Sequence, residues 1–206
     1  MQIKICGLKF PLNIAAVQEL NPDMMGFIFY APSKRFMADT LNAVALKSIP
    51  IHIRKVGVFV NETTENVVNR INQFGLDMVQ LHGAETPEYC AAIRKFVPVL
   101  KAFGVDASFD FNILKAYQNH VDYFLFDTKT EQYGGSGLRF DWSKLNEYDL
   151  DVPFLLSGGI GLDALDDLLQ FKHSRYAGID LNSRFEIEPG LKDIEKLKAF
   201  IELYRQ

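Results

Sequence analysis

The chain has 206 residues, of which 48% are hydrophobic and 23% charged, a composition typical of one soluble globular domain with a substantial buried core. Its net charge of -4 comes without a basic block, which argues against a nucleic-acid partner, and no run of about 18 apolar residues predicts a membrane span. Cys6 and Cys90 are too few for a disulfide framework, and the histidines lack the spacing of metal ligands. Because the first residues also lack the apolar core of a signal peptide, the sequence predicts a cytoplasmic protein without a structural metal.

Short apolar runs follow one another along the chain, with amphipathic stretches between them. The candidate β-strands are QIKIC (2–6), MMGFIF (24–29), KVGVFV (55–60), DMVQL (77–81), PVLKAF (98–103), DYFLFD (122–127), VPFLLS (152–157) and YAGID (176–180). Apolar side chains repeat at helical spacing in two of the stretches: Val67, Ile71 and Phe74, then Ile194, Leu197, Ile201 and Tyr204. Thr86 followed by Pro87 fits an N-cap with proline at the first helical position, which predicts the start of the fourth helix.

The spacing of these runs favours one architecture. Their starts lie 21 to 31 residues apart, the length of one βα unit, and no linker interrupts the series. Eight such units predict an α/β fold of the (β/α)8 TIM-barrel type, as a single domain over residues 1–206, whereas a doubly wound open sheet more often has fewer strands and a clear switch point. In a TIM barrel the active site lies at the carboxyl ends of the strands, so the residues there are the candidates.

The first strand ends at Cys6. Period-two alternation places Ile3 and Ile5 towards the helices and leaves Lys4 and Cys6 to the barrel interior. A thiol at the barrel mouth is a candidate base, and the alternative is a small buried hydrophobic residue. A free thiol has a pKa of about 8.5, so a nearby cation such as Lys4 or Arg35 would be needed to hold a useful fraction of thiolate.

The sixth strand ends at Asp127, which is followed by a loop with glycines at 134, 135 and 137. A carboxyl group at the mouth of an apolar strand is partly desolvated, so its pKa should rise towards that of a general acid. Gly135 and its neighbouring glycines would let the loop fold over a bound substrate and exclude water. The alternative is that Asp127 caps the amides of its own loop and the glycines make ordinary turns.

Two further strand ends carry candidate substrate-binding residues. Arg35 lies in YAPSKRF (30–36) after the second strand and offers a fixed charge and a planar face, unless it is simply a solvated loop arginine. QLHG (80–83) places Gln80 or His82 at the rim after the fourth strand, where we expect a supporting role for His82.

The last two strand ends predict a phosphate site. Gly158 and Gly159 in SGGIG (157–161) would expose backbone amides to an anion, with Asn182 and Ser183 facing them from the following loop. No P-loop, no dinucleotide-binding glycine motif and no lysine suited to a Schiff base is present, so we expect no cofactor. An acid, a base and a phosphate site together favour acid–base isomerisation of a small phosphosugar.

Several motifs resemble one family over nearly the whole chain. They are KICG (4–7), GFIFYAPSKRF (26–36), VGVFVN (56–61), VQLHG (79–83), FDTKTEQYGGSGLRFDW (126–142), LSGGI (156–160) and the DLNS…PGLKD segment (180–193). LSGGI alone is unspecific, but the combination resembles the phosphoribosylanthranilate isomerases of tryptophan biosynthesis.

The resemblance implies a monomeric or homodimeric barrel that acts on a small phosphoribosyl substrate, without metal or cofactor. The implied reaction is an Amadori rearrangement of N-(5-phosphoribosyl)anthranilate to 1-(2-carboxyphenylamino)-1-deoxyribulose 5-phosphate. By resemblance Asp127 protonates the furanose oxygen, Cys6 removes the C2 proton, and Arg35 positions the anthranilate group. In one departure, Arg184 follows Ser183 where the family usually has glycine, and it could either add a charge at the phosphate or point into solvent.

Two alternatives stay open at this point. The isomerase of histidine biosynthesis runs an analogous aminoaldose–ketose reaction on a related barrel, but there we expect a pair of aspartates, against which Cys6 argues. A barrel that binds a phosphate ligand without catalysis is the second, and the presence of both Cys6 and Asp127 speaks against it.

Overall fold

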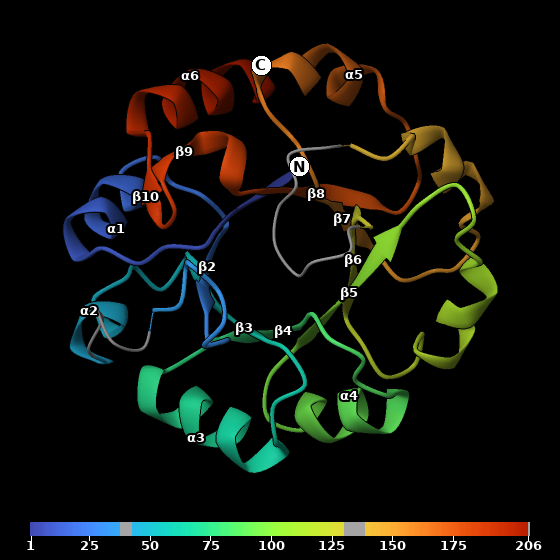
Figure 1. Cartoon of the computed structure of the whole chain (residues 1–206), viewed down its shortest axis with the longest axis horizontal. Helices are drawn as coiled ribbons and strands as arrows, with labels where there is room; N and C mark the ends of the chain where they lie inside the picture. The colour runs from blue at the N-terminus through green and yellow to red at the C-terminus, as the bar shows by residue number, and fades with distance from the viewer. Residues whose placement is uncertain (38–42, 130–138, 206) are drawn as a thin grey trace.

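The fold is a closed barrel of eight parallel strands in chain order (Figure 1). The computed structural model describes residues 1–37, 43–129 and 139–205. The strands are β1 (Gln2–Cys6), β2 (Met24–Ile28), β3 (Arg54–Phe59), β4 (Met78–Leu81), β5 (Val99–Val105), β6 (Tyr123–Thr128), β7 (Phe154–Leu156) and β8 (Tyr176–Leu181). β1 pairs with both β2 and β8, which closes the sheet on itself. The predicted TIM barrel is therefore confirmed, with β7 three residues shorter than expected.

Helices surround the barrel in a ring (Figure 1). The α-helices are α1 (Pro11–Gln18), α2 (Ala43–Lys47), α3 (Thr64–Phe74), α4 (Pro87–Arg94), α5 (Leu165–Gln170) and α6 (Ile194–Tyr204). Short 3-10 helices are η1 (Phe111–Ala116), η2 (Trp142–Glu147), η3 (Leu162–Ala164) and η4 (Ser183–Phe185). No helix within the described ranges is both long enough and apolar enough to cross a lipid bilayer.

The helix signals read from the sequence are confirmed, with two differences. The apolar triplet predicted for α3 is buried, and α4 begins at Pro87 with the Thr86 hydroxyl accepting a hydrogen bond from the Tyr89 backbone N–H at 3.3 Å. The units after β5 and β6 have the 3-10 helices η1 and η2 where a full βα unit would have an α-helix. A 3-10 helix rises about 2.0 Å per residue, so six residues can span a distance that would take eight in an α-helix.

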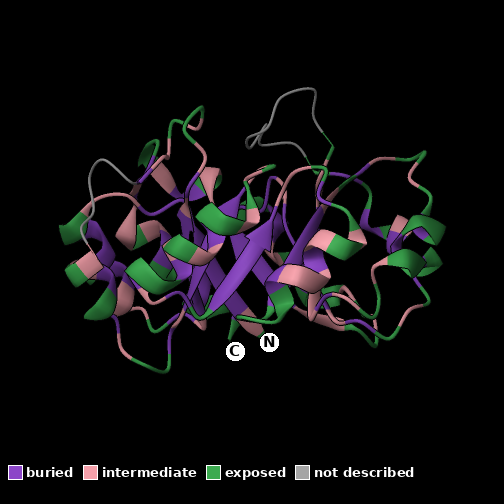
Figure 2. Cartoon of the chain, turned by 90° about the horizontal axis from the view of Figure 1, so that it is seen from below, coloured by how far each residue is buried: buried purple, intermediate pink, exposed green. Residues whose placement is uncertain are grey.

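The strands are largely buried (Figure 2), and alternation along them divides the core in two. Ile3 and Ile5 belong to the outer layer between sheet and helices, as predicted. A smaller cluster fills the barrel interior: Met24, Val56, Met78, Leu100, Ala102, Leu125 and Leu155. Lys4 lies in the same interior, fully buried, where its Nζ atom is 2.8 Å from the Asp180 carboxylate on β8. The apolar cluster forms the floor beneath the polar residues of the barrel mouth.

A short hairpin after β8 was not predicted. It consists of β9 (Glu186–Glu188) and β10 (Leu191–Lys192), paired antiparallel, and lies beside α1 in Figure 1. Asn13 of α1 binds both backbone groups of Lys192 in β10, since its side-chain N–H donates to the Lys192 carbonyl and its side-chain oxygen accepts from the Lys192 backbone N–H, each at 2.8 Å. The hairpin is thereby fixed to the body of the barrel next to the strand-end loops.

Candidate active site

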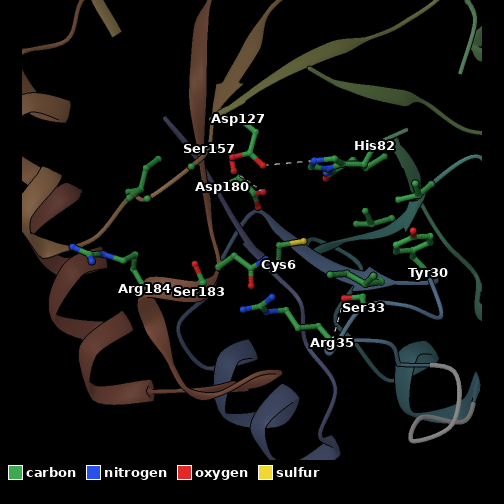
Figure 3. Close-up of a pocket in the computed structure, with 18 residues that line it drawn as sticks. Cys6, Tyr30, Ser33, Arg35, His82, Asp127, Ser157, Asp180, Ser183 and Arg184 are labelled. Carbon is green, nitrogen blue, oxygen red and sulfur yellow. Dashed lines mark hydrogen bonds and ion pairs between the residues drawn. The ribbon is translucent and has the colours of Figure 1, made fainter. Parts of the chain in front are cut away.

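One cavity opens at the carboxyl ends of the strands (Figure 3). Its lining residues come from the ends of seven strands, all but β5, and the loops that follow them: Cys6, Ile28, Tyr30, Ser33, Arg35, Val58, Val60, Gln80, His82, Asp127, Ser157, Gly158, Gly159, Ile160, Asp180, Asn182, Ser183 and Arg184. Every site residue predicted from the sequence is among them except Gly135, which lies outside the described residues together with the rest of the predicted glycine loop. The structure therefore gathers residues separated by up to 178 positions at one place, as the barrel topology requires.

Cys6 is the last residue of β1 and is buried. Gly26 on the neighbouring β2 leaves room for its sulfur, because a Cβ atom there would lie 2.7 Å from Sγ. Burial raises the pKa of the Cys6 thiol, and the positive charge of Lys4 acts in the opposite direction without reversing the shift. Lys4 is thus the cation that the sequence analysis called for, but its charge is shared with Asp180, so the thiol is the resting form.

Asp127 lies in β6 and its side chain is 24% exposed, towards the cavity. Burial raises its pKa to about 6, with a further contribution from the negative charge of Asp180, while the hydrogen bond from the Thr128 backbone N–H opposes the shift. A carboxyl group with this pKa is partly protonated near neutral pH, which suits a general acid. The prediction of a raised pKa from strand-end desolvation agrees in direction with this environment.

His82 follows β4 directly and lies at the rim as expected. Its Nδ1 atom is 2.7 Å from the side-chain amide nitrogen of Gln80, and its Nε2 atom is 3.6 Å from Asp127 Oδ2 (Figure 3). Burial lowers the pKa of His82 to about 4, aided by the positive charges of Lys101 and Lys4. The imidazole is therefore neutral at physiological pH. It lies next to the carboxyl group of Asp127 but carries no positive charge that would stabilise the carboxylate.

Arg35 is held in place and is not a solvated loop residue. Its Nε and Nη2 atoms lie 2.7 to 3.0 Å from the two carboxylate oxygens of Glu186, and only 14% of its side chain is exposed. The Ser33 hydroxyl accepts a hydrogen bond from the Arg35 backbone N–H and supports the turn that carries it. In Figure 3 the guanidinium lies near Cys6 and points into the cavity.

The loops after β7 and β8 form the other end of the cavity. Gly158 and Gly159 have φ values of 84° and 64°, a left-handed conformation that favours glycine. A Cβ atom on Gly158 would lie 2.8 Å from an Asp127 carboxylate oxygen, so this loop packs directly against the candidate acid. Asn182 and Ser183 lie in the loop after β8, and Arg184 lines the cavity while its Nη2 atom pairs with Asp163 at 2.9 Å.

Several residues of the site were not singled out from the sequence. Asp180 pairs with Lys4 and lies near Asp127 (Figure 3), and the sequence carried a signal for it, since it closes the apolar run YAGID as Asp127 closes YFLFD. Glu186 and Lys192 lie behind the cavity, and their places in the segment 180–193 gave no spacing signal by themselves. Across the described ranges no three His, Cys, Asp or Glu side chains are grouped so that they could hold a metal ion.

Comparisons with known proteins agree on one family. The family model for N-(5'phosphoribosyl)anthranilate (PRA) isomerase matches residues 3–203. A protein of Parabacteroides distasonis named N-(5'-phosphoribosyl)anthranilate isomerase is 50% identical over 204 residues, which cover 98% of this chain and 92% of the relative.

Solved structures give the same result. The phosphoribosyl anthranilate isomerase of Thermotoga maritima is 34% identical with a TM-score of 0.89, and the match covers 100% of this chain and 98% of that one. A second structure, of such an isomerase in complex with reduced 1-(o-carboxyphenylamino)-1-deoxyribulose 5-phosphate, is 30% identical with a TM-score of 0.86 and the same coverage. On the family match, the identity to relatives over almost the full length and the shared barrel, this chain belongs to the N-(5'-phosphoribosyl)anthranilate isomerase family.

Proposed function

We propose that this chain isomerises N-(5-phosphoribosyl)anthranilate by an Amadori rearrangement in which Asp127 is the general acid and Cys6 the general base. Membership of the family makes the chain an isomerase of tryptophan biosynthesis. The assignment of roles rests on one observation, the meeting of Cys6, Asp127, Arg35 and the glycine loop after β7 at a single cavity.

The acid step opens the furanose ring. With a pKa of about 6, roughly a tenth of Asp127 is protonated at pH 7, and the group can donate to the ring oxygen. The C1–O bond breaks, the electron pair of the anthranilate nitrogen forms the C1=N double bond, and a protonated Schiff base results. Asp127 is left as a carboxylate, which balances the positive charge of the Schiff base.

The base step removes the C2 proton. The Cys6 thiol is largely protonated before substrate binds, because burial raises its pKa. A cation formed about 4 Å away in surroundings with an effective dielectric of about 20 would favour the thiolate by about 4 kcal/mol, or ~3 pKa units. The Schiff base made by the acid therefore favours loss of the thiol proton to solvent, and the resulting thiolate takes the proton from C2. The electrons of the C2–H bond form the C1=C2 double bond while the π electrons of the C1=N bond move to nitrogen, which gives the enolamine that tautomerises to the ketone.

The two ends of the substrate have separate sites in this proposal. Arg35 suits the anthranilate carboxylate, since a guanidinium binds a planar carboxylate through two parallel hydrogen bonds. Gly158, Gly159, Asn182 and Ser183 suit the phosphate, with Arg184 as an additional charge at the rim. His82 supports Asp127. The complex of a relative with the reduced carboxyphenylamino compound supports a ligand of this shape for the family.

We extend the proposal to the domain organisation, the oligomeric state and the location of the protein. One domain over residues 1–206 is supported by the pairing of the first barrel strand with the last. A monomer or a homodimer is expected, and the isomerase of Thermotoga maritima is described as dimeric, with a solved structure of mutually generated monomers. Cytoplasmic location remains our expectation from the sequence, and the two cysteines are free in the structure.

A fluorescence assay tests the proposed function. Phosphoribosylanthranilate is generated in place from anthranilate and phosphoribosyl pyrophosphate by the preceding enzyme, and its fluorescence is followed after this protein is added with EDTA. We expect rapid enzyme-dependent decay that falls at least about 100-fold in Cys6→Ser and in Asp127→Asn. Decay at the spontaneous rate with folded protein would favour the histidine-pathway reaction or a phosphate-binding barrel without catalysis.

A further inference from the structure

Glu186 joins two cations that differ in their exposure to the cavity. Its carboxylate binds the Nε and Nη2 atoms of Arg35, and its Oε1 atom lies 2.8 Å from Lys192 Nζ. The Gly190 backbone N–H donates to the same oxygen at 3.1 Å. The side chains of Glu186 and Lys192 are 4% and 0% exposed, and neither lines the cavity that Arg35 lines. The ion pair therefore lies behind Arg35, on the side away from the cavity.

This arrangement decides which part of the guanidinium is available. Arginine carries five N–H donors in a planar fork, and Glu186 engages the edge formed by Nε and Nη2. The edge formed by Nη1 and the second N–H of Nη2 has no acceptor among the contacts recorded within the described residues. Two parallel donors on that edge match the two oxygens of a second carboxylate.

Lys192 gives the group of Arg35, Glu186 and Lys192 a net positive charge. Arg35 and Glu186 alone would form a neutral pair, which has little attraction for another anion. With buried Lys192 the three side chains carry a net charge of +1, so Arg35 retains its attraction for a carboxylate although it is already paired. Lys192 Nζ also lies 2.8 Å from Asn182 Oδ1, which links the support of Arg35 to the loop that we assign to the phosphate.

We propose that Glu186, backed by Lys192, is a positioning residue that presents the free edge of Arg35 to the carboxylate of the substrate. The inference rests on the role proposed for Arg35. It adds that Glu186 holds the otherwise flexible Arg35 side chain in one orientation. Arginine loses side-chain entropy when it is fixed, about 2 kcal/mol in total, and here the protein fixes it before substrate binds. Preorganisation of this kind raises affinity without adding a contact to the ligand.

The test compares two ligands that differ only in the carboxylate. The first is reduced 1-(o-carboxyphenylamino)-1-deoxyribulose 5-phosphate, and the second is the same compound without the o-carboxyl group. Binding of both is measured by calorimetry to the unaltered protein, to Arg35→Ala and to the double variant Glu186→Gln/Lys192→Met. The double variant removes the support but keeps the net charge at +1, so a loss in it reports orientation and not charge.

We expect the preference for the carboxylated ligand to fall about tenfold in the double variant, in the direction of Arg35→Ala, while the second ligand binds within about twofold of the unaltered protein. Combining all three substitutions should lower the preference no further than Arg35→Ala alone, because Glu186 acts through Arg35. Glu188→Gln, at an exposed position of the same strand, is the matched control and should leave both affinities unchanged.

Three outcomes overturn the inference in distinguishable ways. An unaltered preference in the double variant would show that Arg35 needs no support. Equal weakening of both ligands would assign Glu186 and Lys192 to support of the phosphate loop through Asn182 or to general stability, and not to the orientation of Arg35. A full preference in Arg35→Ala would remove the role of Arg35 and this inference with it, while the fluorescence assay could still establish the reaction. If the double variant does not fold, Glu186→Asp retracts the carboxylate by one methylene at constant charge, and the same loss of preference is expected.

Discussion

His82 Nε2 lies 3.6 Å from Asp127 Oδ2, and the pKa values of the two side chains are shifted in opposite directions, to about 4 for His82 and about 6 for Asp127, which reverses their usual order. Burial is the first cause of both shifts, since it disfavours the charged form of each group. Near pH 7 the imidazole of His82 is neutral, so it has no positive charge that would lower the pKa of Asp127. The carboxyl group thereby keeps the raised pKa that an acid needs.

The raised pKa of Asp127 predicts that its ionised carboxylate lowers the stability of the fold at neutral pH. Its folded pKa of about 6 exceeds the ordinary value of 3.8, so its favourable contribution is present below about pH 3.8 and is lost as the pH rises through about 6. At pH 7.5 Asp127→Asn should therefore stabilise the fold by about 1 to 2 kcal/mol, after allowance for partial exposure, while turnover falls at least about 100-fold. Thermal melting at pH 7.5 and at pH 3.5 measures the effect, which should vanish at the lower pH.

Asp106 provides a control of opposite sign. The hydrogen bond from Lys129 lowers its pKa to about 2, so its contribution is present above about pH 3.8 and is lost as the pH falls towards 2. Asp106→Asn should slightly destabilise the protein at pH 7.5. A destabilised Asp127→Asn variant at that pH would contradict the proposed environment of the acid.

The pH dependence of kcat/KM follows from both shifts. In the proposed mechanism the active form has protonated Asp127 and ionised Cys6, whereas the resting form at neutral pH has the reverse. Between the two pKa values the protonated fraction of the acid falls tenfold per pH unit while the thiolate fraction rises tenfold, so their product is constant. We expect a flat profile from about pH 6 upwards, a tenfold fall per unit below about pH 6, and no descending limb near neutrality. A maximum at pH 6 to 7 followed by a decline would contradict the assignment.

The strand ends were the predictable part of this molecule. Cys6 and Asp127 each close an apolar run, and in a TIM barrel the ends of parallel strands meet at one mouth whatever their separation in sequence. Periodicity also identified the buried faces of α3 and α6, because the burial of apolar side chains on one face is a local property of the chain.

The supporting residues were not predictable for a physical reason. Glu186 and Arg35 are 151 positions apart, and no local pattern records that one carboxylate will bind two cations behind the cavity. The same holds for the pairing of Lys4 with Asp180, although each lies at a position that alternation assigns to the barrel interior. The direction of the pKa shift of Cys6 likewise depends on how deeply the thiol is buried and on whether the charge of Lys4 outweighs that burial, which only the folded chain decides.

Gly158 is predicted to be needed for the shape of the site. At φ 84° an L side chain is strained, and a Cβ atom would lie 2.4 Å from Thr128 Oγ1 and 2.8 Å from Asp127 Oδ1. Gly158→Ala should lose about 1 to 3 kcal/mol of stability and should lower kcat by about tenfold or more, because the acid is displaced.

Gly75 separates backbone strain from contact with the site. It ends α3 at φ 62°, and the nearest atom to a Cβ there is Lys47 Cγ at 4.0 Å. Gly75→Ala should lose about 1 kcal/mol of stability in thermal melting and leave kcat unchanged. Similar losses of kcat in the two variants would show that strain alone, and not displacement of Asp127, causes the effect of Gly158→Ala.

The contacts of Arg184 predict a role in binding and not in chemistry. Its side chain is 42% exposed, lines the cavity and pairs with Asp163, so it bridges the loops after β7 and β8. Arg184→Ala should raise KM about three- to tenfold at low salt with kcat unchanged, and the difference should shrink as ionic strength rises, because exposed charges are screened. Arg175→Ala, which removes an exposed arginine paired with Asp151 before β8, is the matched control and should leave KM unchanged at every salt concentration. An Arg184→Ala variant with the KM of the unaltered protein would assign this arginine to the surface pair with Asp163 alone.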